Sequence, residues 1–349
     1  MSRNDIAVIG RTAQGTDLLD GQTVKTKVLY EELRRTFPDR KILCVDTWRY
    51  KQRAIPILWD TFRAFVSCGH IFVLLSRNGR TLFFPLITGL GKLFRRRLYH
   101  DVVGGALPGE AKERPSLRRQ LARFEVNWVE LPQMKQELEA LGLTNVEVLP
   151  NFKRLQILSP EDLRPTGKAP YTFTMFSRVC KTKGMTEAIE AVAAVNEGKD
   201  APVARLKIYG PVEDAYRQEF ETLCARHSRY VDYMGTIPQD RSVEALQDSF
   251  MLLFPSVYPG EGMPGTIIDA FSAGLPVIAT DWHFNAQLVR NGETGYHYDW
   301  QKPELLKERI AYAMAHPDEV DAMRPGCLEE AKKYAPEAAM AQIRKKMDG

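Results

Sequence analysis

Residues 251–280 have the sequence MLLFPSVYPGEGMPGTIIDAFSAGLPVIAT, and this segment decides the fold. An apolar strand (Met251–Pro255) is followed by a glycine-rich loop, a helix (Thr266–Ala273), a turn and a second apolar strand (Pro276–Thr280). Two apolar strands joined through a helix are typical of a parallel sheet that helices cover on both faces. The segment therefore predicts an α/β protein with a parallel sheet.

The same alternation of strands and helices fills the rest of the chain, once in each half. In the second half we expect further strands at Tyr171–Ser177, Arg205–Gly210 and Val231–Gly235, and helices at Lys183–Asn196, Val212–His227 and Ser242–Ser249. In the first half we expect strands at Asp5–Gly10, Lys41–Asp46, Ile71–Ser76, Leu98–Val103, Trp128–Leu131 and Val146–Pro150, and helices at Gln22–Thr36 and Pro132–Leu141. This predicts two doubly wound, Rossmann-like domains.

A proline-rich polar segment, Phe152 to Pro170, separates the two halves and is typical of a linker. We expect an N-terminal domain at residues 1–155 and a C-terminal domain at 156–329. A last helix at about 330–349 is expected to pack back on the first domain. Two such domains facing across a cleft place a ligand at the carboxyl ends of their strands.

Composition and charge narrow the class of protein. The 349 residues are 44% hydrophobic and 26% charged, which is ordinary for a globular protein. No apolar segment is long enough to span a membrane and no signal-peptide core is visible, so we expect a cytoplasmic protein. The net charge of +4 combines +10 for residues 1–158 (26 Lys and Arg, 16 Asp and Glu) with −6 for the remainder (22 and 28). The basic half suggests an anionic partner, or simply a solvated surface.

Several common cofactor motifs are missing. Gly10–Thr16 has glycines at P-loop spacing but lacks the lysine, and Gly89–Phe94 lacks the third glycine of a dinucleotide fingerprint. Asp17 and Asp20 are wrongly spaced for an Asp-x-Asp pair, and the histidines and cysteines have no metal-ligand spacing. We therefore predict no metal site and no prosthetic cofactor.

Three segments could contact an anionic or sugar ligand. Arg178 and Lys183 follow the first strand of the second domain, where cations could neutralise a diphosphate, although they could also be solvated. Gly21 and Gln22 follow the first strand of the first domain, where a glycine permits a close backbone approach; a simple capped loop is the alternative. In the glycine-rich loop, Glu261 and the acid of the next helix could hold sugar hydroxyls.

With these motifs the sequence resembles glycosyltransferase family 4, the retaining enzymes of GT-B fold. Glu261 and Asp269 have the spacing of the two acids in that family's signature, and Arg178 with Lys183 matches its Arg-x-x-x-x-Lys-Gly motif. Tyr99-His100-Asp101 matches the strand that ends in the family's active-site histidine. The resemblance spans nearly the whole chain. Asp269 and Gln287 depart from it, since many members have glutamate at both positions.

The resemblance implies that a sugar is transferred from a nucleotide diphosphate sugar, UDP- or GDP-linked, to a glycan or lipid-linked acceptor with retained configuration. The amino-acid sequences of these motifs are similar to those of family members from bacterial polysaccharide gene clusters. The resemblance therefore implies a role in capsule, exopolysaccharide or lipopolysaccharide synthesis. The implied catalytic residues are His100, Arg178, Lys183 and Glu261, and the implied donor-binding residues are Gly21, Gln22, Arg178, Lys183, Glu261, Gly262, Met263, Pro264, Gly265, Thr266 and Asp269.

Three other functions compete with this interpretation. A sugar-nucleotide epimerase shares the two-domain architecture, but the Arg, Lys and acid set fits a transferase better. A non-catalytic glycan-binding protein would not need the charges of Arg178, Lys183 and Glu261. Nucleic-acid binding could follow from the basic half, yet the cations belong to no recognisable nucleic-acid module. We expect no nucleic-acid partner.

The segment Thr81 to Tyr99 suggests a further partner. It is apolar, too short to span a bilayer, and ends in Arg95, Arg96 and Arg97. Apolar surface beside clustered cations is typical of a peripheral protein on an anionic membrane. The alternative is a buried helix of the first domain whose arginines favour the helix dipole.

Overall fold

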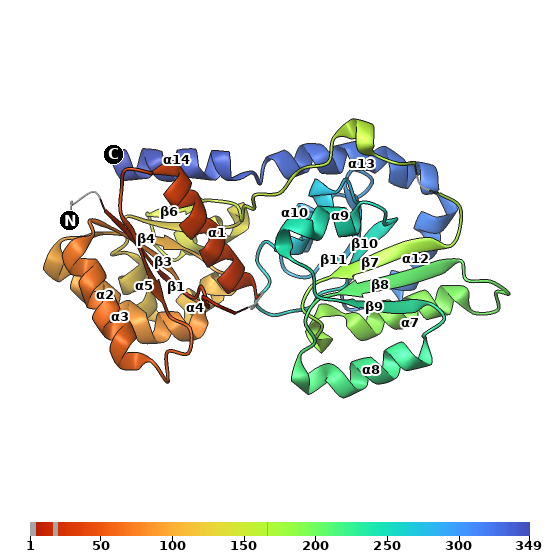
Figure 1. Cartoon of the computed structure of the whole chain (residues 1–349), viewed down its shortest axis with the longest axis horizontal. Helices are drawn as coiled ribbons and strands as arrows, with labels where there is room; N and C mark the ends of the chain where they lie inside the picture. The colour runs from red at the N-terminus through yellow and green to blue at the C-terminus, as the bar shows by residue number, and fades with distance from the viewer. Residues whose placement is uncertain (1–4, 17–19, 166) are drawn as a thin grey trace. The chain divides into compact units, whose positions relative to one another are not determined.

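The computed structural model describes residues 5–16, 20–165 and 167–349, and the chain divides into two compact units (Figure 1). Residues 1–152 and 336–349 form the first unit, and residues 153–335 form the second. Asp17, which was weighed above as part of an acidic pair, lies outside the described residues.

The first unit is built on a parallel sheet of six strands in the order β2-β1-β3-β4-β5-β6. The strands are β1 (Ile6–Gly10), β2 (Ile42–Asp46), β3 (His70–Leu74), β4 (Arg97–Asp101), β5 (Val126–Val129) and β6 (Val146–Val148). The helices are α1 (Gly21–Thr36), α2 (Ala54–Ser67), α3 (Arg77–Phe94), α4 (Leu107–Glu113), α5 (Pro115–Leu121), α6 (Pro132–Ala140) and α14 (Pro336–Asp348).

Helices cover both faces of this sheet, so its central strands are buried along their whole length. Every residue of β1, β3 and β5 is buried. On one face, Phe72, Tyr99 and Trp128 of neighbouring strands stack at centroid distances of 4.8 and 5.7 Å. The C-terminal helix α14 packs against α1, and its Gln342 donates a hydrogen bond to the carbonyl of Val148. The last helix therefore belongs to the first unit.

The second unit repeats this architecture with a parallel sheet in the order β12-β11-β10-β7-β8-β9. The strands are β7 (Tyr171–Phe176), β8 (Ala204–Tyr209), β9 (Val231–Gly235), β10 (Met251–Phe254), β11 (Val277–Thr280) and β12 (Gly295–Tyr298). The α-helices are α7 (Met185–Asn196), α8 (Arg217–Arg226), α9 (Ser242–Leu246), α10 (Gly265–Ser272), α11 (Asn285–Leu288), α12 (Leu305–Ala315) and α13 (Pro317–Lys332). Short 3-10 turns occur at Pro160–Asp162, Lys181–Lys183, Asp214–Tyr216 and Gln239–Arg241.

The strand order of the second unit fixes where its ligand-binding loops meet. β7 is the first strand of this unit, and it pairs with β8 on one side and with β10 on the other. The chain runs from β7 through β8 to β9 at one edge of the sheet. It then crosses back to β10, on the other side of β7, and continues to β12 at the opposite edge. In doubly wound sheets, ligands bind outside the carboxyl ends of the strands at such a switch point.

The predicted fold class, two doubly wound Rossmann-like α/β units, is confirmed, and each predicted strand has a counterpart. The differences lie in segments without a clear hydrophobic period. β12 was not predicted because it has only four residues, and Gly295 and His297 interrupt its two strand-favouring tyrosines. α2 was not predicted, because Asp60 and Arg63 interrupt its apolar segment.

Candidate functional site

The loops that follow β7 and β10 bring three of the predicted site residues into one region of the second unit. Arg178 and Lys183 come from the loop after β7, and Glu261 comes from the glycine-rich loop after β10. The two strands are neighbours in the sheet and run parallel, so both loops leave from the same edge. The strand order is therefore the reason why residues 78 positions apart in the sequence meet.

Lys183 and Glu261 form an ion pair in this region. The Nζ of Lys183 donates to Oε2 of Glu261 at 2.6 Å, and the two side chains are 12% and 8% exposed. Ser256, which is fully buried, donates its hydroxyl to the same carboxylate oxygen at 2.6 Å. The ammonium also lies 5.3 and 5.2 Å from the ring centres of Phe254 and Tyr258. One carboxylate and two aromatic faces thus hold the lysine cation.

A glycine allows this close approach. Gly184 has a φ of +75°, and a Cβ at this position would lie 2.3 Å from the carbonyl oxygen of Pro255. Any other residue would push the turn Lys181–Lys183 away from the end of β10. Gly184 is therefore the feature of the loop that lets Lys183 reach Glu261.

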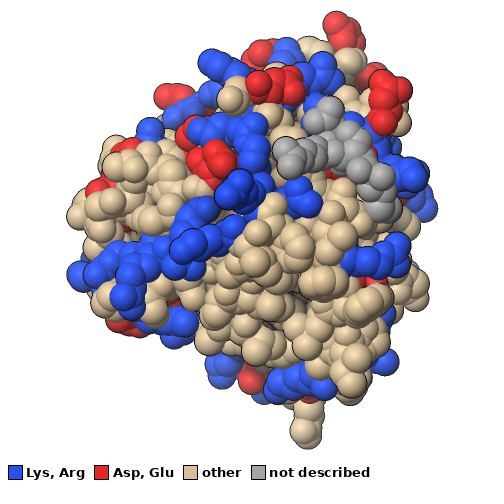
Figure 2. All heavy atoms as spheres, turned by 90° about the vertical axis from the view of Figure 1, so that its left-hand side faces the viewer, with Lys and Arg blue, Asp and Glu red and all other residues tan. Residues whose placement is uncertain are grey.

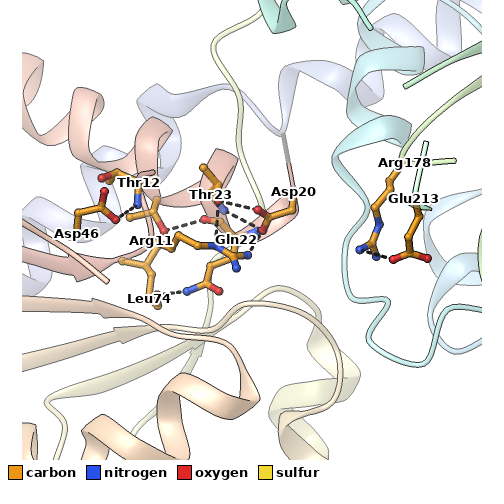
Figure 3. Close-up of polar contacts among 10 residues, drawn as sticks. Arg11, Thr12, Asp20, Gln22, Thr23, Asp46, Leu74, Arg178 and Glu213 are labelled. Atoms are coloured by element: carbon orange, nitrogen blue, oxygen red, sulfur yellow. Dashed lines mark hydrogen bonds and ion pairs between the residues drawn. The ribbon is translucent and has the colours of Figure 1, made fainter. Parts of the chain in front are cut away.

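Arg178 lies beside the same aromatic ring. Its guanidinium is 5.5 Å from the centre of the Tyr258 ring, and NH1 lies 3.5 Å from Oε1 of Glu213 (Figure 3). Both charged side chains are more than one third exposed, so this ion pair is weakly held. An incoming anion could therefore replace Glu213 as the partner of Arg178.

The remainder of the glycine-rich loop leads into α10. Gly262, Met263 and Pro264 are buried, while Gly265 and Thr266 at the start of the helix are partly exposed. The first N–H groups of a helix have no acceptor within the helix and favour an anion. The Thr266 hydroxyl donates to the carbonyl of Phe176 at the end of β7, which fixes the start of α10 against that strand.

Asp269 does not face solvent. It is 1% exposed; Ser242 donates to its Oδ1 at 2.8 Å, and the Nζ of Lys153 donates to its Oδ2 at 2.5 Å. The predicted contact between this acid and a nucleotide stays a prediction. In the structure, both carboxylate oxygens already accept hydrogen bonds from protein groups. The side chain is one methylene shorter than the glutamate of many family members and is already bonded within the unit.

Lys153 and Ser256 are two residues of this region that the sequence analysis missed. Lys153 lies 116 positions before Asp269, in a segment interpreted only as a linker, so no local pattern could connect the two. Ser256 directly follows the predicted strand Met251–Pro255, and its place at a strand end was the signal that could have indicated it.

In the first unit, the chain itself occupies the start of α1. Oδ1 of Asp20 accepts hydrogen bonds from the N–H groups of Gln22 and Thr23, at 3.2 and 3.3 Å, and Arg11 pairs with the same carboxylate (Figure 3). The side-chain amide of Gln22 donates to the carbonyl of Leu74 at 3.0 Å. Of the two residues predicted to approach a donor, Gly21 and Gln22, the N–H group of Gln22 is thus bonded to Asp20, because this aspartate is the helix N-cap.

His100 lies in the core of the first unit and not at a surface. It is 0% exposed, and its ring lies 5.0 Å from Phe84 and 5.4 Å from Phe124. Its Nδ1 lies 3.0 Å from Oδ1 of Asn127, whose amide nitrogen donates to the carbonyl of Leu121, so Nδ1 is the protonated nitrogen of a neutral imidazole. The predicted contact of His100 with a donor sugar stays a prediction. β4 directs this side chain into the interior.

The burial of His100 predicts a stability that depends on pH. Burial, reinforced by Arg80, lowers the pKa of His100 to about 3, whereas the unfolded chain protonates near 6.5. The neutral imidazole thus favours the native state above pH 6.5, and this contribution falls as the pH drops from 6.5 towards 3. At about pH 5 the loss from this one group is about 2 kcal/mol of the free energy of unfolding.

Urea unfolding at neutral pH and at about pH 5 checks this prediction. In His100→Gln the loss of stability between the two pH values should be smaller than in the wild type by about 2 kcal/mol. His316→Gln, at an exposed histidine, is the control and should leave the pH dependence unchanged. An unaltered pH dependence in His100→Gln would contradict the prediction.

The predicted arginine cluster after α3 does not form a free cationic surface. Arg96 donates to the carbonyls of Phe65 and Val66 at the end of α2, at 2.7 and 3.0 Å. Arg97 donates to the carbonyls of Met347 and Lys346 at the end of α14, at 2.7 and 3.0 Å. Two of the three arginines thus bind the carboxyl ends of other helices, and Arg95 is the exposed one of the three.

No group of three or more His, Cys, Asp or Glu side chains in the described part of the chain is arranged to hold a metal ion. Among the same residues, no helix is both long enough and apolar enough to cross a membrane.

Two doubly wound units in one chain are the architecture of the GT-B fold. Residues 161–333 match the model of the family described as "Glycosyl transferases group 1". This match covers nearly all of the second unit and just under half of the chain.

Known proteins resemble the chain in fold and in part of its sequence. Anabaena Alr3699/HepE, solved in complex with UDP-glucose, superposes with a TM-score of 0.76 over 99% of both chains at 14% identity, which shows the shared fold. The "Exopolysaccharide phosphotransferase SCO2592" of Streptomyces coelicolor is 30% identical over 183 residues, 50% of this chain and 18% of that protein. The "Putative colanic acid biosynthesis glycosyltransferase WcaL" of Salmonella typhimurium is 26% identical over 156 residues, 44% of this chain and 37% of that protein. The chain thus matches much less than half the length of these curated relatives.

Proposed function

We propose that the chain is a retaining glycosyltransferase of family 4 that transfers a sugar from a nucleotide diphosphate sugar to a glycan or lipid-linked acceptor in bacterial polysaccharide synthesis. The observation that carries this proposal is the Lys183–Glu261 ion pair at the switch point of the unit that matches the group 1 family. The pair brings together a cation suited to a phosphate and a carboxylate suited to sugar hydroxyls.

In this proposal the diphosphate of the donor is held by Lys183, Arg178 and the free N–H groups at the start of α10. Negative charge grows on the leaving phosphate as the bond to the sugar breaks, so groups that bind this charge lower the barrier. Lys183 exchanges Glu261 for a phosphate oxygen, and Arg178 exchanges Glu213. These groups supply positive charge without a metal ion, and an unchanged rate in the presence of a chelator tests that part.

Glu261 then accepts hydrogen bonds from hydroxyl groups of the donor sugar. Ser256 already fixes one carboxylate oxygen from within the unit, so the carboxylate is oriented before the donor binds. Gly262, Met263 and Pro264 form the wall beside it, and Gly265 and Thr266 face the phosphates. The contacts expected of Asp269, Gly21, Gln22 and His100 rest on the family resemblance alone and stay predictions.

The names of similar proteins support the choice of donor and process. The resemblance to a protein solved with UDP-glucose favours a uridine diphosphate sugar over a guanosine one. The relatives named for exopolysaccharide and colanic acid favour polysaccharide synthesis. Both assignments are specific enough to be tested separately.

A thermal-shift panel of UDP, GDP, ADP and CDP tests the nucleotide first. A ligand that binds only the native state stabilises it by mass action, so UDP at a large excess should raise the melting temperature above the other three. With the matching sugar nucleotides, product analysis follows: transfer with retained configuration at the anomeric carbon supports the proposal. An epimerised sugar nucleotide as the product would contradict the proposal and indicate an epimerase. Binding without turnover of any sugar nucleotide would indicate a non-catalytic glycan-binding protein.

We predict that Glu261→Gln separates the sugar from the nucleotide. The variant loses charge-assisted bonds to the sugar, which should lower kcat/KM by roughly 10–100-fold. The Kd for UDP should stay the same or fall, because Lys183 is freed from its carboxylate partner.

Calorimetric titration with UDP and steady-state kinetics with the UDP-sugar measure the two effects. Glu213→Gln is the matched comparison, since it frees Arg178 from a pair that is 37% and 47% exposed and leaves the carboxylate of Glu261 in place. A tenfold or larger loss of UDP affinity in Glu261→Gln would place the acid on the nucleotide and contradict the assignment.

A further inference from the structure

The first unit exposes an apolar stripe along α2. Ile55, Trp59 and Val66 are 81%, 62% and 49% exposed, and Leu58 and Phe62 lie between them with 47% and 42%. Their spacing of three or four residues puts all five on one side of the helix. The side of a helix that contacts water normally carries polar residues. This side of α2 carries five apolar residues instead.

The opposite side of the same helix is already used by the fold. Ile57, Ala64 and Phe65 are buried, and α2 packs against β2 and α3. α2 therefore carries apolar residues on two sides, although only one side is needed for the core. Side chains that the core does not need are explained by a second apolar partner.

α3 extends the apolar stripe. Phe62 of α2 meets Phe94 at the end of α3 edge to face at 5.8 Å, and it stacks on Trp59 at 6.1 Å. Leu82 and Leu93 of α3 are 55% and 72% exposed. The exposed side of α2 with these two leucines is called the α2–α3 patch below. It contains seven of the eleven large hydrophobic side chains found exposed in the described chain.

The charges around the patch are almost all of one sign. Residues 49–97, which contain α2 and α3, have ten Lys or Arg and only one Asp or Glu, Asp60. The cations that stay exposed here include Arg49, Lys51, Arg53, Arg63, Lys92 and Arg95. Figure 2 shows the side of the first unit on which α2 and α3 lie in Figure 1: Lys and Arg form a band beside a broad uncharged area.

We propose that the α2–α3 patch is the surface by which the protein binds an anionic lipid bilayer. Tryptophan, phenylalanine and leucine enter the boundary between headgroups and acyl chains, while the surrounding cations bind the lipid phosphates. In this proposal α2 lies parallel to the membrane surface, with its exposed apolar side towards the acyl chains. The lipid-facing element is thus α2. Of the three arginines expected from the sequence, Arg95 is one of the surrounding cations, while Arg96 and Arg97 donate to backbone carbonyls.

A second copy of the chain fits the patch less well. A symmetric dimer places the same surface opposite itself, which would bring two sets of cations together with one acid on each side. An anionic bilayer offers both the apolar layer and the opposite charge. The two occupants differ in a measurable way, since only one depends on lipid charge.

Co-sedimentation with vesicles tests the proposal in the full-length chain without any donor, so its outcome is independent of the proposed transferase activity. The vesicles are phosphatidylcholine alone, or equal parts of phosphatidylcholine and phosphatidylglycerol. Wild type should pellet with the anionic vesicles at low salt and be released at high salt, when screening shortens the range of the charges. Protein that stays in the supernatant with anionic vesicles at low salt overturns the proposal.

Two sets of substitutions locate the contact. Ile55→Ser with Trp59→Ser, and separately Lys51→Gln with Arg53→Gln and Arg63→Gln, should each weaken binding by on the order of tenfold or more. The matched controls lie in the second unit: Met234→Ser for exposed apolar surface, and Lys168→Gln with Lys199→Gln and Lys307→Gln for charge. Equal binding by patch variants and controls places the contact elsewhere. A wild-type dimer in gel filtration that Trp59→Ser makes monomeric assigns the patch to a second copy.

A conservative variant tests insertion directly. Trp59→Phe keeps the apolar side chain and should keep vesicle binding within about twofold, because phenylalanine also enters the interface. Quenching of tryptophan fluorescence by brominated lipid should be strong in wild type and largely lost in Trp59→Phe. Quenching that persists in this variant shows that another tryptophan meets the lipid and overturns the placement.

Discussion

Replacing Lys183 by alanine should lower turnover by about 10²–10³-fold while the chain still folds. The ammonium is held between Glu261 and two aromatic rings at the carboxyl edge of the sheet, where the leaving phosphate is proposed to bind. A charge-assisted bond that strengthens as charge develops is lost completely in this variant. Release of nucleoside diphosphate from the donor, per folded molecule, measures the effect.

Lys181 provides a matched control for this experiment. It lies in the same 3-10 turn, carries the same charge, and is 72% exposed with a 3.7 Å pair to Glu219. Lys181→Ala should therefore leave turnover within about threefold, since exposed charges act weakly through solvent. Near-normal turnover in Lys183→Ala, or equal losses in both variants, would remove Lys183 from the diphosphate site.

The architecture could be predicted because both units repeat one local pattern. An apolar strand such as Met251–Pro255, a glycine-rich loop and an amphipathic helix each carry a signal within a few residues. The loop also marks the site, since Lys183 and Glu261 belong to motifs that can be recognised without knowing the contacts. Strand order then brings the two motifs together, and a sheet with both faces covered leaves few alternative arrangements.

What the sequence could not predict depends on partners far away along the chain. Arg96 and Arg97 look like a cationic cluster, but the carbonyls that they bind belong to α2 and α14. His100 follows the motif of an active-site histidine, yet the pleat of β4 turns it between two phenylalanine rings. In each case the local sequence pattern indicates a chemical role, and partners far away along the chain decide where the side chain lies.

Asp269 is the strongest example, and it leads to the second large prediction. Asp269→Asn should lower the free energy of unfolding by about 3 kcal/mol, because Lys153 is left as a largely buried cation without its carboxylate. The pair also links Lys153, where the chain enters the second unit, to α10. The backbone N–H of Lys153 donates to the carbonyl of Tyr334, near the point where the chain leaves this unit. Urea unfolding followed by circular dichroism measures the loss.

An exposed pair of equal length separates burial from distance. Lys332 and Glu329 also lie 2.5 Å apart, but they are 59% and 69% exposed, so Glu329→Gln should cost no more than about 0.5 kcal/mol. Adding Lys153→Met to Asp269→Asn should restore part of the lost stability, because the unpaired charge is removed. The alternative is a direct contact of Asp269 with the ribose. It predicts the reverse: Asp269→Asn would then weaken UDP binding at least tenfold and leave stability nearly unchanged. The burial of both carboxylate oxygens favours the structural outcome.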